Sequence, residues 1–118
     1  MIRSYEDFEV FQRSYKASLA MHKLSLTFPK IEQFGLANQL RRATKSIPMN
    51  IAEGYGKDST STEFKRYLSI ALGSNNEVRV QLKYCKDLGY ITPEDFAKYD
   101  NEYKQIGNML YSLRNNWK

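Results

Sequence analysis

The sequence predicts an all-α fold: an antiparallel up-and-down four-helix bundle that forms a single domain over residues 1–118. Three observations point to this fold. Apolar residues recur at intervals of three and four in four successive segments. The connectors between these segments are short, as between antiparallel neighbours in a bundle. No segment shows the alternation of apolar and polar residues that marks a half-buried strand.

The first helix is expected from Ser4 to about Phe28. Ser4 precedes Glu6 and Asp7, an arrangement typical of an N-cap followed by acids in the first turn. One apolar stripe of this helix consists of Phe8, Phe11, Tyr15, Leu19, His22 and Leu26, and the other of Val10, Ala17, Met21, Leu24 and Phe28. A surface helix needs only one such stripe. Two stripes therefore indicate contact on two sides, with two neighbours in the bundle or with another subunit.

The second helix is expected over about residues 36–55, with Pro48 inside its apolar pattern. An interior proline removes one backbone hydrogen bond and crowds the preceding turn, at a cost of about 3 kcal/mol. Because the apolar pattern continues on both sides of Pro48, we predict one continuous helix that is kinked at the proline. Asn50 or Ser46 could then hydrogen-bond the backbone groups that the proline leaves without a partner. Gly54-Tyr55-Gly56 is expected to end the helix, since glycine supplies the left-handed conformation of a C-terminal cap.

The third helix is expected over about residues 60–88, before a glycine that stops it. Thr60 and Glu63 match a capping box at its start. Its apolar seam has the heptad spacing of helices that pack at shallow angles, and it consists of Phe64, Leu68, Ala71, Asn75, Val78, Leu82 and Cys85. We expect the polar Asn75 at the edge of the seam. The alternative is that Asn75 fixes the register of the helices or a partner. Cys85 is expected to be a small core residue.

The fourth helix is expected from Pro93 onwards. Thr92 as N-cap, Pro93 at the first position and two acids in the first turn form a strong start signal. The seam of this helix consists of Phe96, Tyr99, Tyr103, Ile106, Leu110, Leu113 and Trp117. Gly107 lies within the helix, where it costs about 1 kcal/mol relative to alanine. Close packing is the one reason that the sequence suggests for it.

Residues 40–56 carry the most distinctive motifs of the chain. They contain Leu40-Arg41-Arg42-Ala43, Ser46-Ile47-Pro48 and Asn50-Ile51-Ala52-Glu53-Gly54-Tyr55-Gly56, and the series continues with Glu63-Phe64, Arg66-Tyr67-Leu68-Ser69-Ile70-Ala71, Gly73-Ser74, Glu77 and Leu88-Gly89-Tyr90-Ile91. In these motifs the chain resembles the bacterial four-helix-bundle family of 23S rRNA intervening-sequence proteins, which is related to the accessory variability proteins of diversity-generating retroelements. The resemblance implies a homo-oligomer, namely a homopentamer, with a basic surface that binds RNA or DNA. It also assigns Pro48, Asn50, Glu53 and Gly54 to a structural motif.

The charge of this basic protein is concentrated in the middle of the chain. The net charge is +5. Nine basic residues against four acidic ones lie between Asn38 and Lys86, whereas residues 1–37 carry +1 and residues 87–118 carry −1. The middle segment therefore holds the whole excess. This distribution indicates an anionic partner, and a solvated basic surface is the plainer alternative.

Eight basic residues of the second and third helices are the predicted nucleic-acid contacts. The expected main surface consists of Arg41, Arg42, Lys45, Lys65 and Arg66, and the second choice of Arg79, Lys83 and Lys86. Adjacent arginines offer bidentate phosphate contacts that lysines do not. Like charges four residues apart, such as Arg41 and Lys45, disfavour a helix. Acids of a neighbouring chain or phosphates are expected to compensate.

The sequence contains no persuasive constellation for catalysis. The single His22 and the single Cys85 both lie on apolar stripes, so they are expected to pack in the core. Glu53 and Glu77 could face each other, but Glu53 is expected to pair with Lys57, four residues on, or with a cation on another helix. Di-metal sites in bundles use Glu-x-x-His pairs, which this sequence lacks. We therefore expect no enzymatic activity, no cofactor and no metal.

Two functional hypotheses remain. The leading one is a non-catalytic, oligomeric nucleic-acid-binding protein with RNA or DNA as its ligand. The alternative is a protein-interaction module, an accessory subunit that docks on a partner such as a reverse transcriptase. Binding through phosphate contacts weakens steeply as the salt concentration rises, whereas binding through a mainly apolar protein interface should not. The salt dependence of binding therefore distinguishes the two hypotheses. We expect a cytoplasmic location and no membrane partner, since the sequence shows a single cysteine, no signal peptide and no apolar run of membrane-spanning length.

Overall fold

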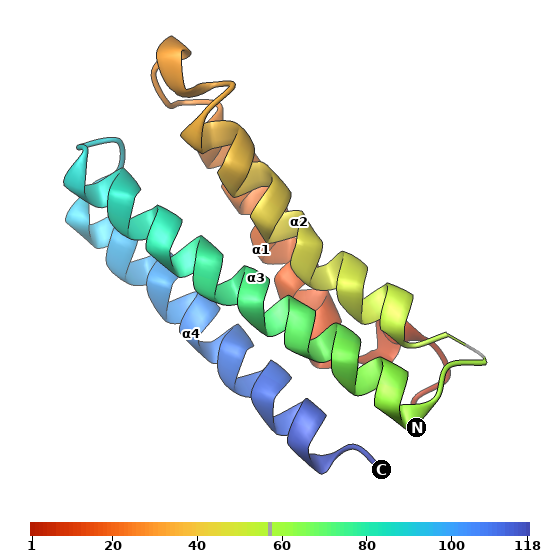
Figure 1. Ribbon diagram of the computed structural model, residues 1–118. Helices are drawn as coiled ribbons and strands as arrows, with labels where there is room; N and C mark the ends of the chain where they lie inside the picture. Colours follow the sequence, from red (N-terminus) through yellow and green to blue (C-terminus); the bar gives the residue numbers. More distant parts are fainter. Residues whose placement is uncertain (57) are drawn as a thin grey trace.

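The computed structural model describes residues 1–56 and 58–118 (Figure 1). These residues form η1 (Tyr5–Asp7), α1 (Glu9–Ser25), η2 (Lys30–Glu32), α2 (Leu36–Gly54), α3 (Ser61–Asp87) and α4 (Pro93–Asn116), where η denotes a short 3-10 helix. The described residues contain no strand, and the predicted all-α four-helix bundle is confirmed. Lys57 lies outside the described residues, and so does its predicted pairing with Glu53.

The four α-helices follow one another around the bundle, each antiparallel to the one before it (Figure 1). The most extensive contacts join α2 to α3, α3 to α4 and α1 to α2, whereas α1 and α4 touch over a much smaller area. The bundle measures 43 × 24 × 19 Å. In this order α2 and α4 occupy opposite corners, and so do α1 and α3. None of the described helices combines the length and the apolar character that crossing a bilayer requires.

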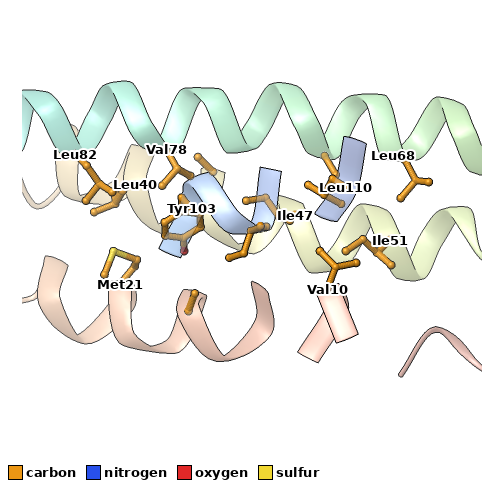
Figure 2. Close-up of a cluster of buried hydrophobic side chains, with 14 of the residues drawn as sticks. Val10, Met21, Leu40, Ile47, Ile51, Leu68, Val78, Leu82, Tyr103 and Leu110 are labelled. Atoms are coloured by element: carbon orange, nitrogen blue, oxygen red, sulfur yellow. The ribbon is translucent and has the colours of Figure 1, made fainter. Parts of the chain in front are cut away.

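The core contains inward-facing residues from all four helices. Figure 2 shows side chains such as Met21 from α1, Leu40 from α2, Leu68 from α3 and Tyr103 from α4 directed toward the centre. These four side chains are 0% exposed. All seven residues of the predicted α3 seam are buried. In the α4 seam, the three central residues are buried and the others are partly buried against the core.

The predicted first helix is interrupted near its start. Ser4 is an N-cap as predicted, but it caps η1 through the backbone N–H of Glu6. Phe8 then takes an extended conformation, and α1 begins after it, so one helix from Ser4 is wrong. The reason lies in the core. Phe8 is only 5% exposed, and its ring packs against those of Tyr55 and Phe64, at centroid distances of 5.0 and 5.5 Å.

The second helix passes through Pro48 without interruption, which confirms the prediction of a continuous helix. Pro48 is buried. The side-chain amide of Asn50 donates to the backbone carbonyl of Ser46 at 2.8 Å and to its hydroxyl at 2.9 Å. The Asn50 side chain therefore provides a hydrogen-bond donor for a backbone carbonyl in the turn that precedes it. The Ser46 hydroxyl also lies 2.8 Å from that of Ser74, and this hydrogen bond joins α2 to α3.

Two glycines at helix ends have different physical reasons. Gly89, with φ of 80°, ends the third helical segment as predicted. It is the one residue of the described chain with positive φ, so the left-handed cap predicted within Gly54-Tyr55-Gly56 is wrong. A Cβ atom at Gly54 would lie 2.5 Å from the Cβ of Tyr67. Gly54 is therefore needed for the close approach of α2 to α3.

Asn75 lies inside the bundle, so its predicted place at the seam's edge is wrong. The side chain is 2% exposed, and its amide donates to the backbone carbonyl of Tyr103 at 2.8 Å. This hydrogen bond joins α3 to α4. It agrees with the alternative stated above, in which Asn75 fixes the register of the helices. A Cβ at Gly107 would lie 2.8 Å from that amide nitrogen. Gly107 thus makes room for Asn75, which explains a glycine in mid-helix.

The predicted N-caps at the other helix starts are confirmed, although the Glu63 carboxylate bonds the Thr60 hydroxyl and not its backbone N–H, so the capping box is only half formed. The Thr60 hydroxyl accepts from the backbone N–H of Glu63 at 3.1 Å, and the Thr92 hydroxyl accepts from that of Asp95 at 3.0 Å. Cys85 is buried, and burial raises the pKa of its thiol to about 11. The thiol therefore stays protonated at neutral pH, as expected of a core residue.

Candidate nucleic-acid interface

Arg41, the first predicted contact, is engaged within the chain. Its guanidinium donates to the Ser25 hydroxyl at 2.9 Å, to the Gln33 side-chain oxygen at 3.2 Å and to the Gln33 carbonyl at 2.8 Å. Ser25 is the last residue of α1, and Gln33 follows η2. Arg41 therefore joins α2 to the end of α1 and to the connector. Its donors are used in holding the fold together.

Arg42 and Lys45 are exposed on the outer side of α2, and Arg42 shares two hollows with acidic residues. Arg42 lines two hollows, one of about 430 Å³ with Glu53 and one of about 280 Å³ with Glu77. Lys45 lies 3.2 Å from the Nδ1 atom of His22. Each hollow contains a carboxylate, which offsets part of the positive charge. The positive electrostatic potential there is therefore weaker than Arg42 and Lys45 alone would produce. No cluster of metal-ligating residues occurs in the described parts of the chain.

Lys65 and Arg66 lie near the other end of the bundle. The guanidinium of Arg66 is 4.7 Å from the ring centroid of Tyr67. The hydrogen bond between Ser46 and Ser74 places the α2 pair beside the middle of α3, and Ser74 is about 14 Å along the helix from Lys65. The structure therefore does not bring the five residues of the predicted main surface into one cluster.

A hollow of about 560 Å³ lies between α3 and α4, and we call it the α3–α4 hollow. It is lined by Asn76, Arg79, Val80, Lys83, Lys86, Phe96 and Asp100. Arg79 donates to both carboxylate oxygens of Asp100, at 2.9 and 3.2 Å, and this bond raises the pKa of Arg79. Lys83 is exposed, and the Nζ atom of Lys86 is 4.5 Å from the Phe96 ring centroid. The second-choice residues thus converge on one site, where three cations face one acid of the lining.

A hollow of about 580 Å³ lies on the other side of α4, between α4 and α1, and we call it the α1–α4 hollow. It is lined by Arg13, Lys16, Ala17, Ala20, Lys98, Tyr99, Asn101 and Glu102. Arg13 donates to both carboxylate oxygens of Glu102, at 2.7 and 3.2 Å, and this bond raises the pKa of Arg13. Lys16 and Lys98 are exposed. Again three cations face one acid.

The outer side of α4 joins the two hollows into one surface. Its exposed residues include Asn101, Lys104, Gln105, Asn108 and Tyr111. No acidic residue follows Glu102 in the sequence. Amide, ammonium and phenol groups of these types are common donors to phosphate oxygens. We call the two hollows together with this outer side the α4 surface.

Sequence reasoning missed half of this surface because it counted charges by segment. Residues 87–118 carry a net −1, which concealed Lys98 and Lys104. The structure shows that both acids in the middle of α4, Asp100 and Glu102, are paired with arginines of neighbouring helices. Among the lysines around them, Lys86 lies 3.7 Å from Asp87, whereas Lys16, Lys83 and Lys98 form no ion pair within the described residues. The available signal was the long C-terminal stretch that lacks acids.

The two adjacent arginines of α2 are expected to respond differently to substitution. Arg41→Ala should lower the free energy of unfolding by about 2 kcal/mol, because three hydrogen bonds from a charged, half-buried group are lost. Arg42→Ala should change it by no more than about 0.5 kcal/mol, since the side chain is exposed. Urea unfolding followed by circular dichroism measures both. Equal stability of the two variants would contradict the internal role of Arg41.

Comparisons with known proteins agree with this architecture. A sequence model of the family described as 23S rRNA-intervening sequence protein matches residues 6–112. Among curated proteins, none matches the chain. Among solved structures, the chain is similar to a protein of unknown function from the S23 ribosomal protein family of Bacteroides thetaiotaomicron. The two are 26% identical with a TM-score of 0.83, over 91% of this chain and 96% of that one.

Proposed function

The chain belongs to the family of 23S rRNA-intervening sequence proteins, and from that premise we propose that it is a non-catalytic protein that binds nucleic acid through the α4 surface. The observation that carries the proposal is the pairing of Asp100 with Arg79 and of Glu102 with Arg13. It leaves exposed lysines on both flanks of one helix. The family name refers to an rRNA, which supports a nucleic acid as the anionic partner.

The shape of the α4 surface suits two rows of phosphates. An α-helix with its side chains is about 10–12 Å wide, and the basic hollows lie along its two sides. Lys83 and Lys86 on one side and Lys16 and Lys98 on the other can then meet phosphates of the two strands that border a groove. Contacts of this kind position a protein on nucleic acid without reading its sequence. RNA and DNA share this backbone chemistry.

The alternative function is that of an accessory subunit that docks on another protein. It is favoured by the exposed apolar side chains of Tyr15, Leu19 and Met49 beside α1 and α2. A contact made by these groups buries apolar surface and depends little on salt. For either function we propose the cytoplasm as the location, because the single Cys85 is buried and forms no disulfide in the described structure.

Fluorescence anisotropy with labelled duplex RNA, duplex DNA and single-stranded RNA of equal length tests the proposal. We expect binding at 50 mM salt that weakens by at least tenfold at 200 mM, because each phosphate contact releases counterions. The ranking of the three ligands then decides between RNA and DNA. Absence of binding to all three at 50 mM salt, or an affinity independent of salt, would contradict the proposal.

A further inference from the structure

Helices α1 and α4 are the least closely packed neighbours of the bundle, and the α1–α4 hollow opens between them. Its volume of about 580 Å³ lies within the range of about 300–1,000 Å³ that is typical of ligand pockets. On the α1 side it is lined by Ala17 and Ala20, whose small side chains leave this space open. Contacts between surface lysines and phosphates do not need a hollow of this size. The hollow therefore has room for a further group of a bound ligand.

Tyr99 of α4 supplies the aromatic ring of this hollow. The ring is partly exposed, and the Nζ atom of Lys98 lies 5.3 Å from its centroid. Proteins hold single-stranded nucleic acid with this combination, since the ring stacks on a base and the cation meets the backbone. In the α3–α4 hollow, by contrast, α3 contributes longer side chains such as those of Arg79 and Lys83. The α1–α4 hollow is therefore the better fit for a base.

A buried hydroxyl lies between the same two helices. Tyr103 follows Tyr99 by one turn of α4 and is 0% exposed, and Figure 2 shows its hydroxyl directed toward α1. Burial raises the pKa of Tyr103, so the hydroxyl keeps its proton at neutral pH. It forms no hydrogen bond with the described residues. Because an unpaired buried hydroxyl costs free energy, a ligand whose polar edge enters between α1 and α4 gains affinity by supplying the partner.

We propose that the α1–α4 hollow receives one unpaired base of the bound nucleic acid. The base stacks on the Tyr99 ring, and its polar edge is turned toward the Tyr103 hydroxyl. Lys98, or Lys16 across the hollow, then meets the phosphate of the same nucleotide. This inference rests on the proposed function and names the class of nucleic acid that the α4 surface prefers.

That class is nucleic acid with an unpaired nucleotide. In a perfect duplex both faces of a base are covered by its neighbours, and its hydrogen-bonding edge is occupied by the paired base. A base in a bulge or loop can be turned out of the stack, so its face and its edge are free for a protein. Stacking on the ring releases no counterions. It should therefore add affinity that does not change with salt, unlike the phosphate contacts.

Three labelled duplexes of one sequence test the inference, each prepared in RNA and in DNA. One is fully paired, one has a single unpaired adenine nucleotide, and one has an abasic residue at that position. The abasic duplex keeps the extra phosphate and the flexibility of the bulge and lacks only the base. In anisotropy titrations we expect the adenine bulge to bind about tenfold more tightly than the abasic bulge, both at 50 mM and at 200 mM salt.

The fully paired duplex separates this inference from the proposed function. Equal affinity for the adenine bulge and the abasic bulge would overturn the inference, while binding to the fully paired duplex would leave the proposed function standing. Absence of binding to all three duplexes would contradict both.

Two variants locate the base. Ala20→Phe places a ring in the α1–α4 hollow, and Ala20 is exposed, so the variant should fold. Tyr99→Leu removes the stacking ring and keeps an apolar side chain. In both variants we expect the preference for the adenine bulge over the abasic bulge to disappear. The preference compares two ligands of one protein, so a general loss of affinity cancels.

Ala52→Phe is the matched control. It makes the same change in a hollow of about 350 Å³ between α1 and α2, and it should keep the wild-type preference. Circular dichroism verifies the helical content of all three variants. A wild-type preference in Ala20→Phe or in Tyr99→Leu would overturn the inference, and so would loss of the preference in Ala52→Phe.

Discussion

Replacing Lys83 and Lys98 together by glutamate is expected to lower the affinity for duplex nucleic acid by about a hundredfold or more. Each lysine belongs to one of the two hollows that flank α4. Hydrogen bonds to charged groups contribute about 1.5–3 kcal/mol each, and about 1.4 kcal/mol corresponds to a factor of ten. Both residues are exposed, so the fold should be unaffected. Anisotropy titration at 50 mM salt measures the loss.

The matched control is the replacement of Arg42 and Lys45 by glutamate, which changes the net charge by the same amount on α2. This variant should keep most of the wild-type affinity, because both residues lie away from the α4 surface and each of the two hollows that Arg42 lines contains a carboxylate. The α4 variant should also reduce the slope of log affinity against log salt by about 0.9 for each lost phosphate contact. A larger loss in the control than in the α4 variant would move the binding site to α2.

Gly54→Ala is expected to destabilise the protein by about 2–3 kcal/mol, within the range for an overpacked core. The new methyl group would lie 2.5 Å from the Cβ of Tyr67. That atom is fixed to the α3 backbone, so no change of rotamer can relieve the clash and the two helices must move apart. The melting temperature should fall by about 10 °C. Thermal unfolding followed by circular dichroism is the measurement.

Glu53→Ala, one residue earlier, is the control for this substitution. Glu53 is exposed, so the change should stay within about 0.5 kcal/mol. If Gly54→Ala melted at the wild-type temperature, α2 and α3 would not approach each other as closely as the structure shows.

Features that depend on a few adjacent residues could be predicted from the sequence. The N-caps at Thr60 and Thr92 and the stop at Gly89 are local hydrogen-bonding and backbone preferences, and all three are confirmed. The errors at Phe8 and Asn75 have another origin. The ring of one and the amide of the other find partners on distant helices, and those contacts override the local pattern.

The candidate site shows the same limit more strongly. Arg41 and Arg42 are both arginines and count equally in any tally of charge. Successive residues of a helix, however, project about 100° apart. One therefore reaches Ser25 and the other reaches solvent. The ion pairs of Asp100 and Glu102 join residues 21 and 89 positions apart. No charge count along the chain anticipates them, so the lysines that they leave uncompensated became visible only in the fold.

Lysine footprinting tests most directly whether nucleic acid binds on α4. The protein is acetylated briefly with and without saturating duplex, and the modified positions are quantified by mass spectrometry. Our account predicts that the duplex protects Lys83, Lys86, Lys98 and Lys104 and leaves Lys30 and Lys45 as reactive as before. Protection of Lys45, with the four lysines of the α4 surface unchanged, would contradict it.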